Sequence, residues 1–392
     1  MSGSNEILML GGGNPGHIPE VQKIFQRRLL DIANSKTEFT RIIGNYDQPQ
    51  GEGKFIEALA SLLRKQFGWD ISPENIALTA GSQSGFFFLF NMFGGDYADG
   101  SQRRIMLPMV PEYIGYSDVG LSDDLFIANK PEIEILGNHV FKYHVDFSHL
   151  QLPADTGALC VSRPTNPTGN VLSDAEIQHL LDICQKRDIP LIIDNAYGMP
   201  FPNIIFTDVN LFWSSHTILC MSLSKLGLPG ARIGIILAQP DVIRAITNMN
   251  AVLNLALGSF GPALTLEMIG NGEIINISRE LIRPYYETKA RAAIALLEQE
   301  LNGVDFYIHK PEGAIFLWLW IPELPISSEE LYQRLKQKGV LVISGHHFFP
   351  GLKEDWPHQH ECLRITYSMQ TAVVEQGLKI IAAEIIDCLQ TS

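Results

Sequence analysis

A lysine with two neighbouring hydroxyls and an arginine stands in a segment that is otherwise poor in charge. The segment reads SLSKLGLPGARIG, from Ser222 to Gly234, and follows the apolar run TILCM. Because apolar stretches flank Lys225, burial would disfavour its ammonium form and leave a nucleophilic amine. Such an amine is suited to forming a Schiff base with a carbonyl compound. A surface loop is the alternative interpretation of these residues taken alone.

An aspartate ends a second apolar run, PLIID, at Asp194, and Tyr197 follows three residues later. An aspartate in this place often serves only as a helix cap or a turn former. Pyridoxal phosphate (PLP), however, needs a carboxylate that keeps its pyridine nitrogen protonated, because the positive ring is the electron sink for a carbanion. Asp194 meets that need, and we expect Tyr197 to hydrogen-bond the phenolic oxygen of the same ring.

A third polar segment, SRPTNPTGN, follows the apolar run ALCV. Turn formation alone explains Pro164, Pro167 and Gly169. Asn166 lies between the two prolines, and we expect its side chain to point into the same site as Lys225.

The segments NPTG, DNAYG and SLSKLGLPGARIG together resemble the fold-type I PLP-dependent aminotransferases. The resemblance extends from GGGNPGHIP at Gly11 to LRITY at Leu363. In detail, NYDQPQG, AGSQS, PEYIGY, KPEGAIFLWLW and WPHQHEC resemble the branch of this family that acts on valine and pyruvate. The resemblance implies an α/β fold with a three-layer large domain, built on a mostly parallel sheet, and a smaller α+β domain.

The resemblance also implies roles around the cofactor ring. Lys225 would hold PLP as a Schiff base and, once the substrate amine displaces it, move the proton from the substrate Cα. Asp194 would pair with the pyridinium, while Tyr197 and Asn166 would hold the phenolic oxygen. Tyr113, in PEYIGY, matches the position whose ring stacks on the cofactor, with a core tyrosine as the alternative.

A phosphate site is expected where the strand-like run NIALT leads into an apolar helix, because helix N-termini attract anions. The residues expected there are Gly81, Ser82, Gln83, Ser222, Ser224 and Arg232. The guanidinium of Arg232 offers a forked pair of donors that a lysine lacks. Tyr46, in NYDQPQG, matches a family tyrosine that reaches the phosphate from the neighbouring subunit, which implies a homodimer with shared active sites.

The substrate carboxylate is expected to meet an arginine. Arg364, in LRITY, matches the family arginine that binds the α-carboxylate in a bidentate pair, although a surface ion pair is the alternative. Gly13, in GGGNPG, would let the backbone approach the same carboxylate, and Asn166 would also contact it. Because Arg364 and Lys225 are expected on different domains, substrate binding would close the cleft.

Alternating helices and strands from about Lys54 onward must position these residues. Phe55, Leu59 and Leu63 recur at helical spacing and predict an amphipathic helix. Ser173 and Glu176 form a capping box, which predicts a helix ahead of the PLIID run. Four apolar runs that end in polar residues predict parallel strands buried on both faces: RIMLP, ALCVSR, PLIIDN and TILCMSLSK.

The C-terminal third predicts a second, α+β unit from DFYIHK, AIFLWLW, a helix led by Ser328, VLVIS, LRITY and a final helix. We therefore expect a large PLP-binding domain over residues 45–280 and a small domain made of residues 1–44 and 281–392. His346 and His347, in VISGHHFF, are expected to pack or to line the substrate pocket.

Composition excludes several classes of protein. The chain has 392 residues, of which 46% are apolar and 18% charged, as in globular proteins with a sizeable core. Its net charge of −14 disfavours nucleic acid and anionic membranes as partners. The five cysteines include no CxxC pair, so we expect buried thiols and no metal site. No secretory signal is apparent, and no apolar run approaches the ~20 residues of a membrane span, so we expect a cytoplasmic protein.

The sequence thus predicts a ping-pong transaminase that moves the amino group of L-valine, or a similar aliphatic amino acid, to pyruvate, giving 2-oxoisovalerate and L-alanine. An aminotransferase for alanine or aromatic substrates, or a PLP lyase, remains compatible with the same fold. One methylene in an apolar pocket changes selectivity by only ~1–3 kcal/mol, so the side-chain preference stays open. A PLP-sensing regulator is the alternative from another class, but we expect no room for the DNA-binding module that it needs.

Overall fold

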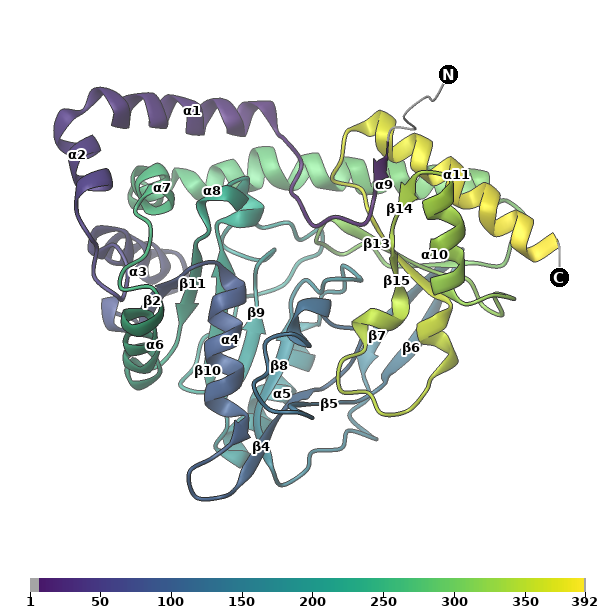
Figure 1. Ribbon diagram of the computed structural model, residues 1–392, viewed down its shortest axis with the longest axis horizontal. Coiled ribbons are helices and arrows are strands. Elements are labelled where there is room, and N and C mark those ends of the chain that lie inside the picture. Colours follow the sequence, from purple (N-terminus) through teal and green to yellow (C-terminus); the bar gives the residue numbers. More distant parts are fainter. Residues whose placement is uncertain (1–6, 391–392) are drawn as a thin grey trace.

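The computed structural model describes residues 7–390, in which two sheets organise the chain (Figure 1). The larger sheet consists of β2 (Ile76–Thr79), β3 (Gly95–Asp96), β4 (Gln102–Leu107), β5 (Phe126–Ala128), β8 (Thr156–Ser162), β9 (Leu191–Asp194), β10 (Thr217–Ser222) and β11 (Gly234–Leu237). Its strand order is β2-β11-β10-β9-β8-β4-β3, with β5 beside β4.

The four strands predicted from apolar runs pair in parallel, in the order β10, β9, β8 and β4. Every residue of β8 and β10 is buried, because the sheet is covered on both faces and no polar face is needed. The strands β11 and β3 depart from the parallel arrangement: β11 runs antiparallel to β10 and β2, and the short edge strand β3 runs antiparallel to β4. The prediction of a mostly parallel sheet is confirmed.

Helices connect and cover these strands. They are α3 (Gly53–Phe67), α4 (Ser82–Phe93), α5 (Asp174–Arg187), α6 (Pro240–Leu253), α7 (Phe260–Gly270) and α8 (Glu273–Ile277). The predicted capping box begins α5: Ser173 Oγ accepts from the Glu176 N–H at 3.2 Å, and Glu176 Oε2 accepts from the Ser173 N–H at 2.7 Å. The amphipathic prediction for α3 is also confirmed, because Phe55, Leu59 and Leu63 are fully buried.

The second sheet has the order β15-β16-β13-β12-β7-β6. Its strands are β6 (Pro131–Gly137), β7 (Val140–Val145), β12 (Tyr307–His309), β13 (Phe316–Trp320), β15 (Ile343–Ser344) and β16 (Cys362–Thr366). The helices α10 (Ser328–Gln337) and α11 (Thr371–Gln390) belong to the same region. The long helix α9 (Arg283–Glu300) extends from the side of the larger sheet to α11 (Figure 1).

The N-terminal segment joins this second region, because β1 (Leu8–Met9) pairs in parallel with β14 (Val340–Leu341). The helices α1 (Pro19–Asn34) and α2 (Lys36–Gly44) then lead back toward the larger sheet, and α1 contacts α7. The hairpin β6–β7 lies within residues 45–280, yet β7 pairs with β12 of the second sheet. The division of the chain into domains at residues 45 and 280 stays a prediction. The β6–β7 hairpin belongs by sequence to the predicted large domain but by pairing to the second sheet.

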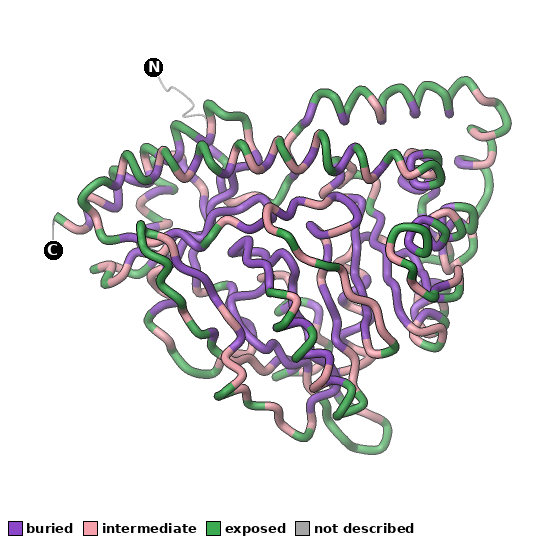
Figure 2. Tube along the Cα trace, turned by 180° about the vertical axis from the view of Figure 1, so that it is seen from behind, coloured by how far each residue is buried: buried purple, intermediate pink, exposed green. Residues whose placement is uncertain are grey.

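Burial concentrates in the strands, whereas the outer helices alternate between buried and exposed residues (Figure 2). All five cysteine side chains are buried, as predicted. Within residues 7–390, none of the helices combines the length and the apolar character needed to cross a membrane.

Candidate active site

The ends of β8, β9 and β10 meet at one edge of the larger sheet, beside a cavity of about 300 Å³. Most residues predicted from the sequence line this cavity: Gly13, Ser82, Gln83, Tyr113, Asn166, Asp194, Tyr197, Ser222, Ser224, Lys225, Arg232 and Arg364. They gather because parallel strands place their carboxyl ends at the same edge of a sheet.

Lys225 follows β10 on a short 3-10 turn, Ser224–Leu226. Its Nζ donates a hydrogen bond to the carbonyl oxygen of Gly13 and lies 5.3 Å from the centre of the Tyr197 ring. Burial and the charge of Arg364 lower the pKa of the Lys225 amine to about 8, against the opposing effect of Asp194. An appreciable fraction of the amine is therefore uncharged near neutral pH, as a nucleophile requires.

Asp194, at the end of β9, is held through both carboxyl oxygens. Its Oδ2 accepts from the hydroxyl of Tyr116 at 2.9 Å, and its Oδ1 accepts from the Ala196 N–H at 3.0 Å. Burial raises its pKa to about 6, although the Ala196 N–H, Tyr116 and Lys225 counteract this rise. Asp194 is thus mainly ionised at neutral pH and suited to a pyridinium partner.

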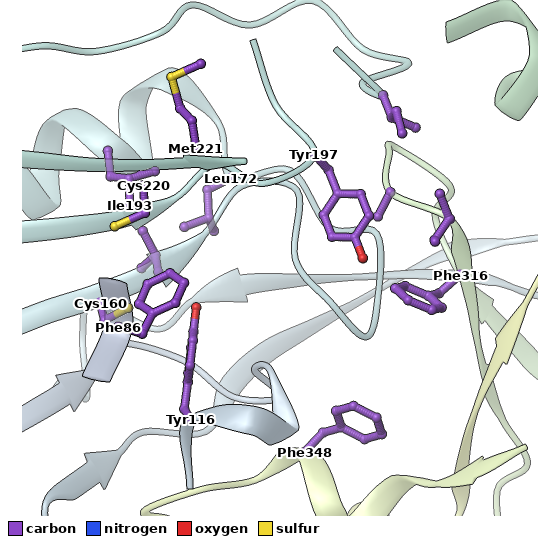
Figure 3. Close-up of a cluster of buried hydrophobic side chains, with 14 of the residues drawn as sticks. Phe86, Tyr116, Cys160, Leu172, Ile193, Tyr197, Cys220, Met221, Phe316 and Phe348 are labelled. Atoms are coloured by element: carbon purple, nitrogen blue, oxygen red, sulfur yellow. The ribbon is translucent and has the colours of Figure 1, made fainter. Parts of the chain in front are cut away.

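Tyrosines surround this carboxylate. Figure 3 shows the Tyr116 hydroxyl directed toward the strands that carry Cys160 and Ile193, and the Tyr197 hydroxyl directed toward Phe316. Tyr113 packs edge-on against Tyr116, with ring centroids 5.4 Å apart. Because Tyr113 is only partly buried and lines the cavity, it is not a core tyrosine.

Arg364 reaches the cavity from β16 of the second sheet. Its Nη1 donates to Asn166 Oδ1 at 2.8 Å, and its Nη2 donates to the carbonyl oxygen of Gly11 at 2.6 Å. The rings of Phe316 and Phe348 lie 4.3 Å and 5.0 Å from its guanidinium carbon. Arg364 is only 5% exposed, so the alternative of a surface ion pair is wrong. Both acceptors are neutral oxygens, which leaves its charge available for a carboxylate.

The expected phosphate site contains donors and one residue that makes space. Ser82 and Gln83 begin α4, whose N-terminus has no side-chain cap. The Gly81 N–H instead donates to the Thr79 carbonyl oxygen at 2.8 Å. A Cβ on Gly81 would lie 2.3 Å from Arg232 Nη2, so only glycine admits the guanidinium at this place. Gly81 therefore contributes space for Arg232 in place of a free amide.

Of the two serines near Lys225, Ser222 already uses its hydroxyl in hydrogen bonds within the loop. Ser222 Oγ accepts from the Ser224 N–H at 3.0 Å and donates to the Ile233 carbonyl oxygen at 3.3 Å. Its proton is therefore already used within the loop.

These residues fit PLP. An amine of lowered pKa, an ionised carboxylate and a set of anion-binding donors border one cavity, as the aldehyde, ring nitrogen and phosphate of PLP require. The arginine beside them carries a side-chain Nε with no hydrogen-bond partner within residues 7–390. That arrangement suits a ligand with a carboxylate next to the cofactor.

Two predicted residues contribute differently from expectation or lie elsewhere. A Cβ on Gly13 would lie 3.8 Å from Lys225 Nζ, an ordinary contact, so what Gly13 contributes here is its carbonyl oxygen. Tyr46 is 83% exposed and lies outside the cavity of its own chain.

Sequence reasoning missed the residues behind Asp194. Tyr116, Glu112 and Ser162 form hydrogen bonds around it, although PEYIGY contains the first two. The spacing of Tyr116, three residues after Tyr113, was the available signal. Phe316 and Phe348, beside Arg364, were also missed and carry no polar signature.

The two histidines of VISGHHFF lie on the 3-10 turn Gly345–Phe348 and outside the cavity lining. Donor atoms of His346, His347 and Glu329 lie within 4.8 Å of one another. His346 Nδ1 also pairs with Ser344 Oγ at 2.8 Å. The expected lack of a metal site stays a prediction.

The sequence of this chain is similar to those of known aminotransferases. Residues 134–381 match the family model of class I and II aminotransferases. Over 378 residues the chain is 52% identical to the valine–pyruvate aminotransferase of Escherichia coli (strain K12), covering 96% of this chain and 90% of that protein.

Solved structures agree with this likeness. The valine–pyruvate aminotransferase from Salmonella typhimurium LT2 superposes with a TM-score of 0.92 at 49% identity, covering 98% of this chain and 97% of that one. A putative amino-acid aminotransferase from Psychrobacter arcticum 273-4 has a TM-score of 0.97 at 45% identity, covering 100% of this chain and 94% of that one.

Proposed function

This chain belongs to the class I and II aminotransferases, and from that membership we propose that it transfers the amino group of L-valine, or a similar aliphatic amino acid, to pyruvate. The products are 2-oxoisovalerate and L-alanine. The observation that carries the proposal is the meeting of Lys225, Asp194 and Arg364 around one cavity. They supply an amine, a carboxylate and a guanidinium, which are the groups that a PLP-dependent transfer between amino acids and 2-oxo acids requires.

The cofactor is PLP, which when bound supplies the electron sink that stabilises negative charge at the substrate Cα. We assign Asp194 to its ring nitrogen, and Tyr197 with Asn166 to its phenolic oxygen. Tyr113 would stack on the ring. The residues assigned to the phosphate are Ser82, Gln83, Ser224 and Arg232, with Gly81 making space for Arg232 and Ser222 holding the loop through the Ser224 N–H.

Lys225 has two roles in this proposal. Its amine binds the cofactor, and after the substrate amine has displaced it the freed amine accepts a proton from the substrate Cα and returns it on the cofactor side. A pKa of about 8 suits both roles, because the amine then takes up and releases a proton near neutral pH. The Gly13 carbonyl oxygen holds the amine at the cavity.

Arg364 would bind the α-carboxylate that all four substrates and products share. Its two donors now bond to Asn166 and Gly11, so a substrate carboxylate would replace the neutral Gly11 oxygen with a charged acceptor. Phe316 and Phe348 flank the guanidinium and would exclude water from that pair. Because Arg364 belongs to the second sheet, the exchange would also draw the two sheets together around the substrate.

The proposal includes a homodimer in which Tyr46 reaches the partner's phosphate site. Tyr46 adjoins Asp47, whose Oδ2 accepts from Ser259 Oγ at 2.5 Å. Large apolar side chains are exposed on these same segments: Phe39, Ile43, Val252, Leu253, Leu255 and Phe260. An exposed apolar surface of this kind is typical of a protein interface.

The expected cytoplasmic location stays a prediction.

The test is the visible absorbance of the purified protein with PLP, recorded after L-valine and then after pyruvate. We expect valine to bleach the band of the bound cofactor and pyruvate to restore it. Bleaching by another amino acid but not by valine would keep transamination and overturn the valine assignment. A protein that gives no cofactor band with added PLP would contradict the proposal as a whole.

A further inference from the structure

A second carboxyl group lies behind Asp194 and has no role in the proposed reaction. Glu112 is 2% exposed. Its Oε1 accepts from the Ser162 N–H at 2.8 Å, and its Oε2 contacts Ser162 Oγ. The Glu112 N–H donates to the Phe348 carbonyl oxygen at 2.8 Å, so the segment is held on the substrate side as well.

Hydrogen bonds connect this carboxyl group to Asp194. Ser162 Oγ lies 3.2 Å from the Tyr116 hydroxyl, and that hydroxyl donates to Asp194 Oδ2 at 2.9 Å. The Tyr116 ring is fully buried and packs against Phe86 and Phe90, with both centroid distances at 5.1 Å. The packing of the ring therefore holds the Tyr116 hydroxyl in its hydrogen bond to Asp194.

The hydroxyl protons of Ser162 and Tyr116 bear on the protonation state of Glu112. The single proton of the Tyr116 hydroxyl goes to Asp194, so the contact between Ser162 and Tyr116 needs the proton of Ser162. With the Ser162 proton directed to Tyr116, a proton on Glu112 would make the contact between Ser162 Oγ and Glu112 Oε2. An ionised Glu112 would instead take the Ser162 proton and leave two oxygens facing each other without one.

We propose that Glu112 is a protonated positioning residue, and that its hydrogen-bonded chain through Ser162 and Tyr116 holds Asp194 as an ionised carboxylate aligned for the cofactor's ring nitrogen. This inference rests on the proposed function of Asp194. The chain acts in one direction, because each hydroxyl donates toward Asp194. Its effect is to strengthen the hydrogen bond that Asp194 receives and to fix one of its two oxygens.

The charges around Glu112 favour this state. The titratable groups that face it are Asp194, Tyr116 and Cys160, and none of them is a cation. Burial raises the pKa of Glu112 to about 8, with Asp194 adding to the rise and Ser162 opposing it. Two buried carboxyl groups this close do not ionise together readily, so the proton on Glu112 allows Asp194 to keep its charge.

Infrared spectroscopy of the full chain without added PLP tests the proton directly. At pH 7 we expect the carbonyl band of a protonated buried carboxyl group, absent from Glu112→Gln and retained in Asp194→Asn. The band should disappear as the pH rises through about 8. A spectrum of Glu112→Gln that retains the band would overturn the inference, while leaving the proposed reaction untouched.

Cofactor affinity tests the positioning role. Removing the donor to Asp194 with Tyr116→Phe, or the proton on the chain with Glu112→Leu, should weaken PLP binding by roughly 10- to 100-fold, as for loss of a hydrogen bond to a charged group. Glu112→Gln, in contrast to Glu112→Leu, should keep most of the PLP affinity. The glutamine amide can donate to Ser162 Oγ while its oxygen accepts from the Ser162 N–H.

The pH profile separates positioning from a merely structural role. From pH 7 to 9 the PLP affinity of the wild type should fall relative to that of Glu112→Gln, which has no proton to lose at this site. Parallel pH profiles, or a Glu112→Gln variant as weak as Tyr116→Phe at pH 7, would contradict the inference. A wild type that binds no PLP at all would instead count against the proposed function, since the infrared band does not depend on the cofactor.

Discussion

Arg364 Nη1 donates a 2.8 Å hydrogen bond to Asn166 Oδ1, and this bond joins the second sheet to the loop after β8 of the larger sheet. The two residues are 198 positions apart in the sequence. The contact places the charge that would bind substrate beside an amide that would bind both substrate and cofactor. The guanidinium that would bind the substrate carboxylate therefore also connects the two sheets.

Arg364→Lys should therefore impair both half-reactions. A lysine supplies a charge but no forked pair of donors, so kcat/KM for L-valine and for pyruvate should each fall by about 10- to 100-fold. Steady-state kinetics with each substrate varied in turn measures this. PLP affinity serves as the control and should change much less, because Arg364 does not hold the cofactor. A loss confined to one substrate would contradict a shared carboxylate site.

Lys225→Ala should abolish turnover while PLP still binds without a covalent bond. General acid–base catalysis typically contributes about 10²- to 10⁴-fold, and loss of the covalent attachment adds to this. Single-turnover absorbance with L-valine gives the rate, and far-UV circular dichroism confirms the fold. The matched control is Lys186→Ala, which changes an exposed lysine on α5. Transamination by the Lys225 variant near the wild-type rate would remove the central assignment.

Gly81→Ala should weaken PLP binding through Arg232. The added methyl would lie 2.3 Å from Arg232 Nη2, and the φ of +86° at Gly81 disfavours any side chain. Displacing one charged donor should raise the dissociation constant of PLP by about 10-fold or more. Gly53→Ala is the control, because a Cβ there meets no atom within 4 Å. Equal PLP titrations for the two variants would show that Arg232 does not need this space.

Stability should depend on pH through Glu112. Its folded pKa of about 8 lies above its ordinary value of 4.5, so the folded state holds a proton that the unfolded chain has released. The contribution of this proton to the free energy of unfolding is complete below pH 4.5. It is lost as the pH rises toward 8, on the order of 1 kcal/mol per pH unit. Urea unfolding at several pH values should show the free energy of unfolding of the wild type falling relative to that of Glu112→Gln as the pH rises from 5 to 8, because the glutamine has no proton to lose. A constant difference from pH 5 to 8 would indicate that Glu112 is ionised in the folded state.

Tyr46→Phe should lower PLP affinity without changing the oligomeric state. The Tyr46 side chain is 83% exposed in the single chain. Loss of its hydroxyl can therefore change PLP affinity only if Tyr46 contacts the phosphate site of a partner subunit. We expect a dimer by sedimentation for both proteins and a dissociation constant for PLP raised about 10-fold, as for a hydrogen bond to a charged group. A monomeric wild type, or unchanged PLP affinity, would rule out the shared site.

Much of the fold and the site could be predicted from local patterns. Strands β4, β8, β9 and β10 were recognisable because uninterrupted apolar runs are typical of strands buried on both faces. Lys225, Asp194 and Asn166 follow three of these runs, so their convergence followed from the parallel arrangement. The hairpin β6–β7 could not be assigned in this way, because its partner β12 lies more than 150 residues away in the numbering.

The sequence by itself determined which chemical groups are available and which strand ends carry them, since residue type and short-range periodicity decide both. Only the tertiary structure decided what those groups contact. It directs the Gly81 N–H to Thr79, sets the Asn166 amide against Arg364, and places the Glu112 chain behind Asp194. These contacts join residues from separate elements, and the pKa shifts of Lys225 and Asp194 come from burial that only packing creates.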